Sequence, residues 1–143
     1  MPGIVVGVDG SSHSRKALER AAAEAVAHGA PLTVLAVHQA VRDVYGSVSH
    51  YPEDASLTAK AKEAAQAETD EVLAGLSSKP TSVTVTSVHG LPADELVKAS
   101  QDADMLVLSR RGSGGFARLL MGSVTGQVAE HAACPILIVP PAE

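Results

Sequence analysis

Short apolar runs alternate with helical stretches along almost the whole chain, and this alternation constrains the fold more than any other feature. The apolar runs predict strands at residues 4–8, 32–38, 83–88, 105–108 and 136–139. Apolar residues at helical spacing, with turn residues and prolines at the ends, predict helices at residues 14–28, 56–76, from 92 onward, and 124–133. Strands that alternate with helices connect in parallel, so the sequence predicts a mostly parallel sheet covered on both faces.

The composition excludes several classes of protein. A chain of 143 residues that is 45% hydrophobic and 19% charged has the size and character of one folded domain. The net charge of -5, with no cluster of basic residues, argues against binding to nucleic acid. No run approaches the roughly 20 apolar residues of a membrane span. The single cysteine forms no internal disulfide. We therefore expect a cytoplasmic protein that binds neither nucleic acid nor membrane.

A glycine-rich segment follows the fourth predicted strand, with three glycines within residues 112–115. Glycine lets the backbone turn sharply and approach a ligand closely. Gly122 and Ser123 are predicted to start the last helix, whose free N–H groups favour an anion, and the hydroxyls of Ser123 and Thr125 add donors. A glycine loop followed by an ordinary serine N-cap explains the same residues equally well.

Two well-known phosphate motifs do not fit this segment. Gly112, Gly114 and Ala117 match the dinucleotide fingerprint in spacing, but that motif continues into a further strand–helix unit with an acidic residue. Here the chain is nearly finished, and the last predicted strand ends in Pro140 and Pro141. A Walker-type loop needs Gly-Lys followed by Ser or Thr, and the chain has no such triplet.

A third pattern fits better. Gly112, nine residues, and then Gly122-Ser123 resemble the phosphate-binding signature of the universal stress protein family. Three other segments, in the family's order, are similar to its opening strand and turn, its entry to the third helix and its closing strand: residues 4–11, 90–93 and 134–139. The resemblance thus covers residues 1–143 as one universal stress protein domain.

One position departs from the signature. Ser109 stands where the family pattern has its first glycine. If that position needs a positive φ, the Cβ of serine strains the backbone, and the contact on the ribose side of a nucleotide weakens.

The resemblance implies a fold and a ligand site. The fold is a single open five-stranded parallel sheet of strand order 3-2-1-4-5 with helices on both faces, Rossmann-like and of the adenine nucleotide alpha hydrolase-like kind. The ligand is ATP or another adenine nucleotide, with Mg²⁺ assisting. The implied contacts are Asp9 and the backbone of Val37 at the adenine, Gly7 and Ser109 at the ribose, and Gly112, Gly122, Ser123, Val124 and Thr125 at the phosphates. Two of these keep an alternative reading, since Asp9 can cap a helix and Val37 can be core.

The resemblance also implies a homodimer through the last strand and a nucleotide-responsive stress-response module rather than an enzyme. We expect little or no hydrolysis, because no Walker lysine and no general base beside the loop can be named. The alternative is a dimeric partner-interaction module of the same fold that uses no nucleotide. The six histidines show no metal-like spacing, so we expect ordinary surface or edge histidines.

Overall fold

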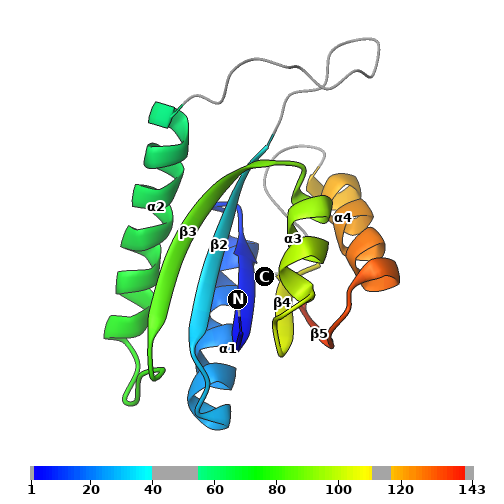
Figure 1. Ribbon diagram of the computed structural model, residues 1–143. Coiled ribbons are helices and arrows are strands. Elements are labelled where there is room, and N and C mark those ends of the chain that lie inside the picture. The colour runs from blue at the N-terminus through cyan, green and yellow to red at the C-terminus, as the bar shows by residue number, and fades with distance from the viewer. Residues whose placement is uncertain (1, 40–54, 111–116, 141–143) are drawn as a thin grey trace, which may run out of the picture.

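The computed structural model describes residues 2–39, 55–110 and 117–140, with the side chains of residues 39, 55 and 117–123 excepted. Five parallel strands form one sheet in the order β3-β2-β1-β4-β5 (Figure 1). The strands are β1 (Ile4–Val8), β2 (Leu32–Gln39), β3 (Val83–Gly90), β4 (Met105–Ser109) and β5 (Ile136–Val139). The helices are α1 (Ser12–His28), α2 (Ala55–Ala74), α3 (Pro92–Ser100) and α4 (Ala117–His131). This strand order confirms the predicted fold class.

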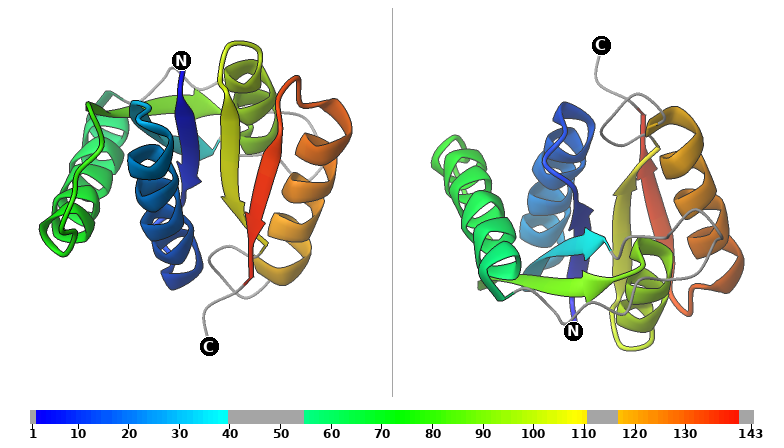
Figure 2. Two further views of the ribbon diagram at one scale, coloured as in Figure 1. Left: turned by 90° about the horizontal axis from the view of Figure 1, so that it is seen from below. Right: turned by 90° about the horizontal axis from the view of Figure 1, so that it is seen from above.

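Two helices cover each face of the sheet (Figure 2). Side chains of α1 and α2 pack with one set of strand residues, and those of α3 and α4 pack with the opposite set. The alternation is visible in β1, where Val5 belongs to the second core and Val6 to the first, each 0% exposed. Since successive strand residues point to opposite faces, a nearly continuous apolar strand is what a sheet covered on both sides requires.

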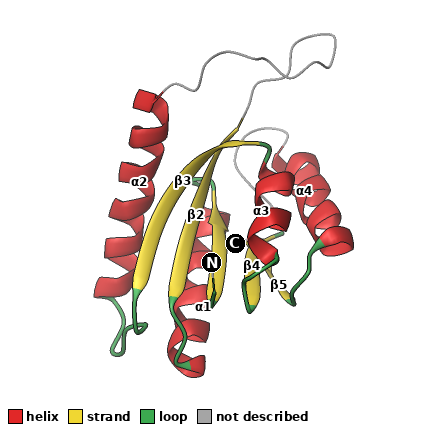
Figure 3. Ribbon diagram, viewed as in Figure 1, coloured by secondary structure: helices red, strands yellow, loops and turns green. Residues whose placement is uncertain are grey.

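Local signals account for most of the element boundaries (Figure 3). The chain leaves α1 at Gly29, whose φ of 60° is the left-handed conformation that glycine adopts without a steric penalty. Pro92 stands in the first turn of α3, where its missing N–H costs no hydrogen bond. The bounds of β1 and β5 agree with the prediction residue for residue.

The last helix was predicted wrongly. The sequence pattern places its start at residue 124, whereas α4 begins at Ala117. Gly122 and Ser123 therefore lie inside the helix rather than at its N-terminus. The predicted surface loop at residues 39–55 falls largely outside the described residues, because only its end residues belong to β2 and α2. Across the described ranges, no helix is both long and apolar enough to cross a membrane.

Candidate functional site

The strand order reverses between β1 and β4, which lie side by side in the middle of the sheet. In open parallel sheets, ligands bind outside the carboxyl ends of the strands at such a switch point. β1 ends in Val8 and is followed by Asp9, whereas β4 ends in Ser109 and is followed by the exposed Arg110. These two ends bound the candidate site.

The turn after β1 is held by a closed set of hydrogen bonds. Oδ1 of Asp9 accepts a bond from the backbone N–H of Ser11 at 2.9 Å and one from its hydroxyl at 2.6 Å. Oγ of Ser11 accepts the backbone N–H of Ser14 at 3.1 Å, which makes Ser11 the N-cap of α1. The hydroxyl of Ser14 donates to the carbonyl of Ser11 and accepts the N–H of Asp9, both at 3.2 Å. Asp9 therefore does not cap the helix itself. Ser11 is the N-cap, and the exposed carboxylate of Asp9 accepts two hydrogen bonds from Ser11.

Charged residues of α1 and α2 lie near this turn. Arg15 pairs with Glu71 across the two helices at 2.6 Å, and its pKa is raised chiefly by that hydrogen bond. Burial raises the pKa of Glu68, and the negative charge of Asp9 raises it further, while Arg15 opposes both. The Arg15–Glu71 pair thus joins the first turn of α1 to α2.

Gly7 has a packing reason to be glycine. A Cβ added there would lie 3.0 Å from Cδ2 of Leu96 on α3 and 3.2 Å from Cδ2 of Leu108 on β4. Both leucines are almost completely buried, so Gly7 lets α3 approach the sheet closely. This packing role stands beside the ribose contact that the resemblance implies, which remains a prediction.

The structure brings Ser109 and Thr125 together. The hydroxyl of Thr125 donates to the carbonyl of Ser109 at 3.3 Å, and the two residues are 6% and 1% exposed. The hydroxyl expected to face phosphate therefore joins α4 to the end of β4. Val124, one residue earlier, packs against the core shared by α3 and α4.

The strain expected at Ser109 is absent. Its φ is not positive, and the residue is paired in the ladder with Val139 of β5 as ordinary extended strand. Because any residue adopts this conformation, replacing glycine by serine at this position strains no backbone.

The other residues that the resemblance places at the phosphates are only partly described by the structure. Gly112 lies outside the described residues. Gly122 and Ser123 belong to the interior of α4, where backbone N–H groups are bonded to carbonyls one turn earlier. The free N–H groups of this helix are those of its first turn, which begins at Ala117. The N-terminal end of α4 thus follows the glycine-rich segment closely in the sequence.

At the end of β2, the structure shows a contact that the sequence analysis missed. The Val37 side chain packs against the core beside α3 and α4, in agreement with its alternative role as a core residue. The next residue, His38, contacts His89 of β3 with ring centroids 5.2 Å apart. The two histidines are 51 positions apart in the sequence, and only the parallel register of β2 and β3 makes them neighbours. A search for histidines near the ends of adjacent predicted strands would have found them.

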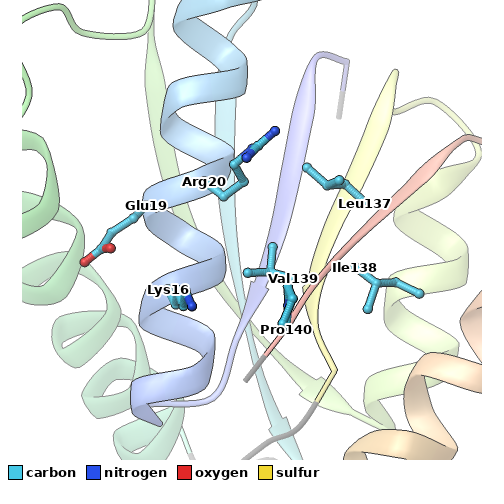
Figure 4. Close-up of a pocket in the computed structure, with 7 residues that line it drawn as sticks. All are labelled: Lys16, Glu19, Arg20, Leu137, Ile138, Val139 and Pro140. Atoms are coloured by element: carbon cyan, nitrogen blue, oxygen red, sulfur yellow. The ribbon is translucent and has the colours of Figure 1, made fainter. Parts of the chain in front are cut away.

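A groove of about 480 Å³ lies between α1 and β5 (Figure 4). Lys16 and Arg20 of α1 line one side, and residues 137–140 line the other. Within the described part of the chain, no three His, Cys, Asp or Glu side chains are grouped so that they could hold a metal ion.

The doubly wound sheet, with its reversal of strand order at β1 and β4, defines the class of Rossmann-like α/β proteins. A model described as the universal stress protein family matches residues 2–140, and the chain belongs to that family. It is 33% identical over 138 residues to a universal stress protein of Thermus aquaticus, covering 95% of this chain and 96% of that protein.

Other relatives are longer. The chain is 37% identical over 138 residues to universal stress protein Rv2623 of Mycobacterium tuberculosis, covering 94% of this chain but only 44% of that protein. The chain thus spans about half the length of this relative.

Solved structures show the same fold. A universal stress protein in complex with cAMP superposes with a TM-score of 0.68 at 28% identity, covering 99% of this chain and 98% of that one. The hypothetical protein MJ0577 superposes with a TM-score of 0.72 at 22% identity, covering 99% and 97%.

Proposed function

We propose that this chain binds an adenine nucleotide, ATP with Mg²⁺, at the switch point between β1 and β4 and acts as a nucleotide-responsive regulatory module. The observation that carries the proposal is the pairing of a switch point with a helix N-terminus: α4 begins at Ala117, directly after the glycine-rich segment that follows β4. A helix N-terminus presents free N–H groups and the positive end of its dipole to an anion.

The related structure solved with cAMP supports an adenine nucleotide as the ligand class. In the proposed site, Asp9 and the backbone of Val37 bound the adenine, Gly7 and Ser109 lie near the ribose, and Gly112, Gly122, Ser123 and Val124 lie near the phosphates. Since the hydroxyl of Thr125 already donates to Ser109, its part is to position α4 rather than to bind phosphate. ATP, with Mg²⁺ as its counterion, is the ligand that the resemblance to the family signature implies.

Calorimetric titration with ATP, AMP and cAMP tests this proposal. A single saturable site for ATP is expected, and Gly122→Val is expected to abolish it because the added side chain blocks approach to the loop. Gly126→Val is the matched control, since Gly126 lies one turn further along α4 and an added Cβ there meets nothing within 4 Å. Equal ATP affinity in the unmodified protein and Gly122→Val would refute this placement.

We also propose little or no hydrolysis, because the sequence has no Gly-Lys-Ser/Thr triplet whose lysine would stabilise the charge that develops in phosphoryl transfer. Phosphate release followed over hours at saturating ATP tests this directly. Steady turnover would instead make the chain an enzyme.

The homodimer is a separate proposal, supported by the edge strand β5. Ile138 is 41% exposed there, on the strand that ends the sheet beyond β4. Edge strands present unpaired N–H and C=O groups that pair readily with a second strand, and a two-fold dimer pairs the same surface with itself. Light scattering is expected to report a dimer for the unmodified protein and a monomer or aggregates for Ile138→Lys. Leu57→Lys, at the similarly exposed Leu57 of α2, is expected to remain dimeric.

A further inference from the structure

Asp9 and Arg110 are the first residues after the two strands that meet at the switch point. β1 and β4 are paired in parallel up to Val6 and Val107, and each strand then continues for two more residues. Asp9 and Arg110 are therefore level with each other along the sheet, and both are exposed. An acidic and a basic side chain thus lie together at the edge where open parallel sheets bind their ligands.

The strand pattern assigns the side chain of Arg110 to one face of the sheet. Leu106 and Leu108 of β4 pack in the core beneath α3 and α4. The backbone N–H of Arg110 donates to the carbonyl of Val139 at 3.0 Å, so the ladder with β5 reaches this residue. Because strand residues two apart share a face, the Arg110 side chain lies on the side of α3 and α4. Val37, at the end of β2, packs on the same side.

The charges on the two sides of the switch point differ. After β1, Arg15 pairs with Glu71 at 2.6 Å and with Glu19 at 3.7 Å, so its positive charge is already compensated. Asp9 adds a further carboxylate on that side. Arg110 forms no ion pair with any residue in the ranges 2–39, 55–110 and 117–140. A polyanion that approaches this edge is therefore repelled beside β1 and attracted beside β4.

We propose that the guanidinium of Arg110 binds the phosphate chain of the nucleotide and makes the site prefer ATP to nucleotides with fewer phosphates. This inference rests on the proposed nucleotide site at the switch point and names the residue that selects its ligand. A guanidinium presents its N–H donors in a planar fork that matches the oxygens of a phosphate group. Since the attraction grows with the negative charge of the ligand, it is largest for ATP, smaller for AMP and absent for adenosine.

Calorimetric titration of the full-length chain with ATP, AMP and adenosine, in one buffer that contains magnesium, tests the inference. Arg110→Gln is expected to lower the affinity for ATP about tenfold, the affinity for AMP less, and that for adenosine not at all. Arg110→Lys keeps the charge but loses the planar fork, so an intermediate loss for ATP is expected. Lys98→Gln is the matched control, because it removes an exposed positive charge in the last turn of α3. This control is expected to bind all three ligands as the unmodified protein does.

The outcomes separate this inference from the proposed function. If the unmodified protein binds ATP and Arg110→Gln binds it equally well, the inference is wrong and the proposed function stands. Equal losses for ATP and adenosine would also overturn the inference, since Arg110 would then shape the site rather than pair with phosphate. If the unmodified protein binds none of the three ligands, the proposed function fails, and this inference fails with it.

The dependence of ATP affinity on salt is a second measurement. Added salt screens the attraction between a guanidinium and phosphate, so the affinity of the unmodified protein is expected to fall more steeply with salt than that of Arg110→Gln. Equal salt dependence in the two proteins would contradict a charge contact. The exposed Arg110 has no carboxylate partner in the described part of the chain, so the variant is expected to unfold at the same temperature as the unmodified protein.

Discussion

The two chain segments that bound the candidate site differ in how they are built. The turn after β1 is short and closed by hydrogen bonds between Asp9, Ser11 and Ser14, all within six consecutive residues. The end of β4 is instead tied by a contact over 16 residues, from Thr125 on α4 to the carbonyl of Ser109. The first turn is therefore determined by local sequence, whereas the β4 side depends on how α4 packs. Local sequence reasoning placed a turn correctly at the first, although α1 begins at Ser12 and is capped by Ser11 rather than Asp9. At the second it misplaced the start of α4.

The largest expected effect on stability comes from the close packing of Gly7, near the end of β1. Gly7→Val places a branched side chain where even a Cβ would lie 3.0 Å from Leu96. Overpacking of this kind is expected to lower the free energy of unfolding by about 1–3 kcal/mol, measured by urea denaturation. The control is Gly126→Ala on α4, which is expected to raise stability by up to about 1 kcal/mol because alanine favours a helix. If Gly7→Val were as stable as the unmodified protein, the glycine would not be needed for packing, and the ribose contact would be its remaining explanation.

The next prediction compares Ser11, in the turn after β1, with Ser123, in α4 on the β4 side. Ser11→Ala removes the N-cap of α1 and is expected to cost about 1 kcal/mol, seen as a lower midpoint in thermal unfolding. Ser123→Ala is expected to cost nothing, because Ser123 lies inside α4 and caps no helix. An equal loss of stability in both variants would indicate that Ser123 caps the last helix, as the sequence pattern predicted.

Thr125→Val probes the long-range contact on the β4 side. The substitution keeps the shape of the side chain and removes the hydroxyl that donates to Ser109. A loss of about 0.5–1.5 kcal/mol is expected from the deleted hydrogen bond in a buried site. Thr125→Ser, which retains the hydroxyl, should recover part of that loss in the same denaturation experiment. Unchanged stability in Thr125→Val would mean that packing alone joins α4 to β4.

The smallest expected effect depends on pH and concerns the charge near the first turn. The pKa of Glu68 is raised by burial and by Asp9, Glu71 and Glu19, while Arg15 lowers it. The folded state therefore holds the Glu68 proton more tightly than the unfolded state, whose pKa is about 4.3. Stability contributed by this group is present at low pH and is lost as pH rises through the folded pKa.

Glu68→Gln stays uncharged at every pH, so it is expected to be slightly more stable than the unmodified protein at pH 7. The gain stays below about 0.5 kcal/mol because the site is partly exposed to solvent. It should shrink toward zero as the pH falls to about 4. A gain that grows on acidification would contradict the sign of the pKa shift.

The parts of the fold that were predicted correctly rest on strong local patterns. β1 and β5 are runs of β-branched and leucine residues bounded by turn residues, and Pro92 marks the first turn of α3. The start of α4 was predicted wrongly because Gly122-Ser123 looks like a helix start. Residues 117–121, Ala-Arg-Leu-Leu-Met, are all strong helix formers. Together they outweigh the roughly 1 kcal/mol that one interior glycine costs.

The candidate site was less accessible to sequence reasoning, because its features depend on neighbours across the sheet. The strain expected at Ser109 does not arise, since the residue is the last member of a ladder with β5. The contact of His38 with His89 is invisible to any search for histidines four residues apart, because it is created by strand register. Position within the sheet, rather than spacing along the chain, decides both.

The strand that comes first in the chain lies third in the sheet, and this has a consequence for how the protein is synthesised. β2 and β3 can pair beside β1 once residue 90 has left the ribosome, since each joins a strand close to it in sequence. The other edge of β1 can pair only after β4 has been synthesised. The hydrogen bond from the backbone N–H of Gly3 to the carboxylate of Asp104, just before β4, spans 101 positions. Until residues 105–109 emerge, the edge of β1 that will pair with β4 keeps unpaired backbone N–H and C=O groups at the centre of the future sheet. Contacts this distant in sequence form slowly, and that interval is when the chain is most exposed to association with other unfolded chains.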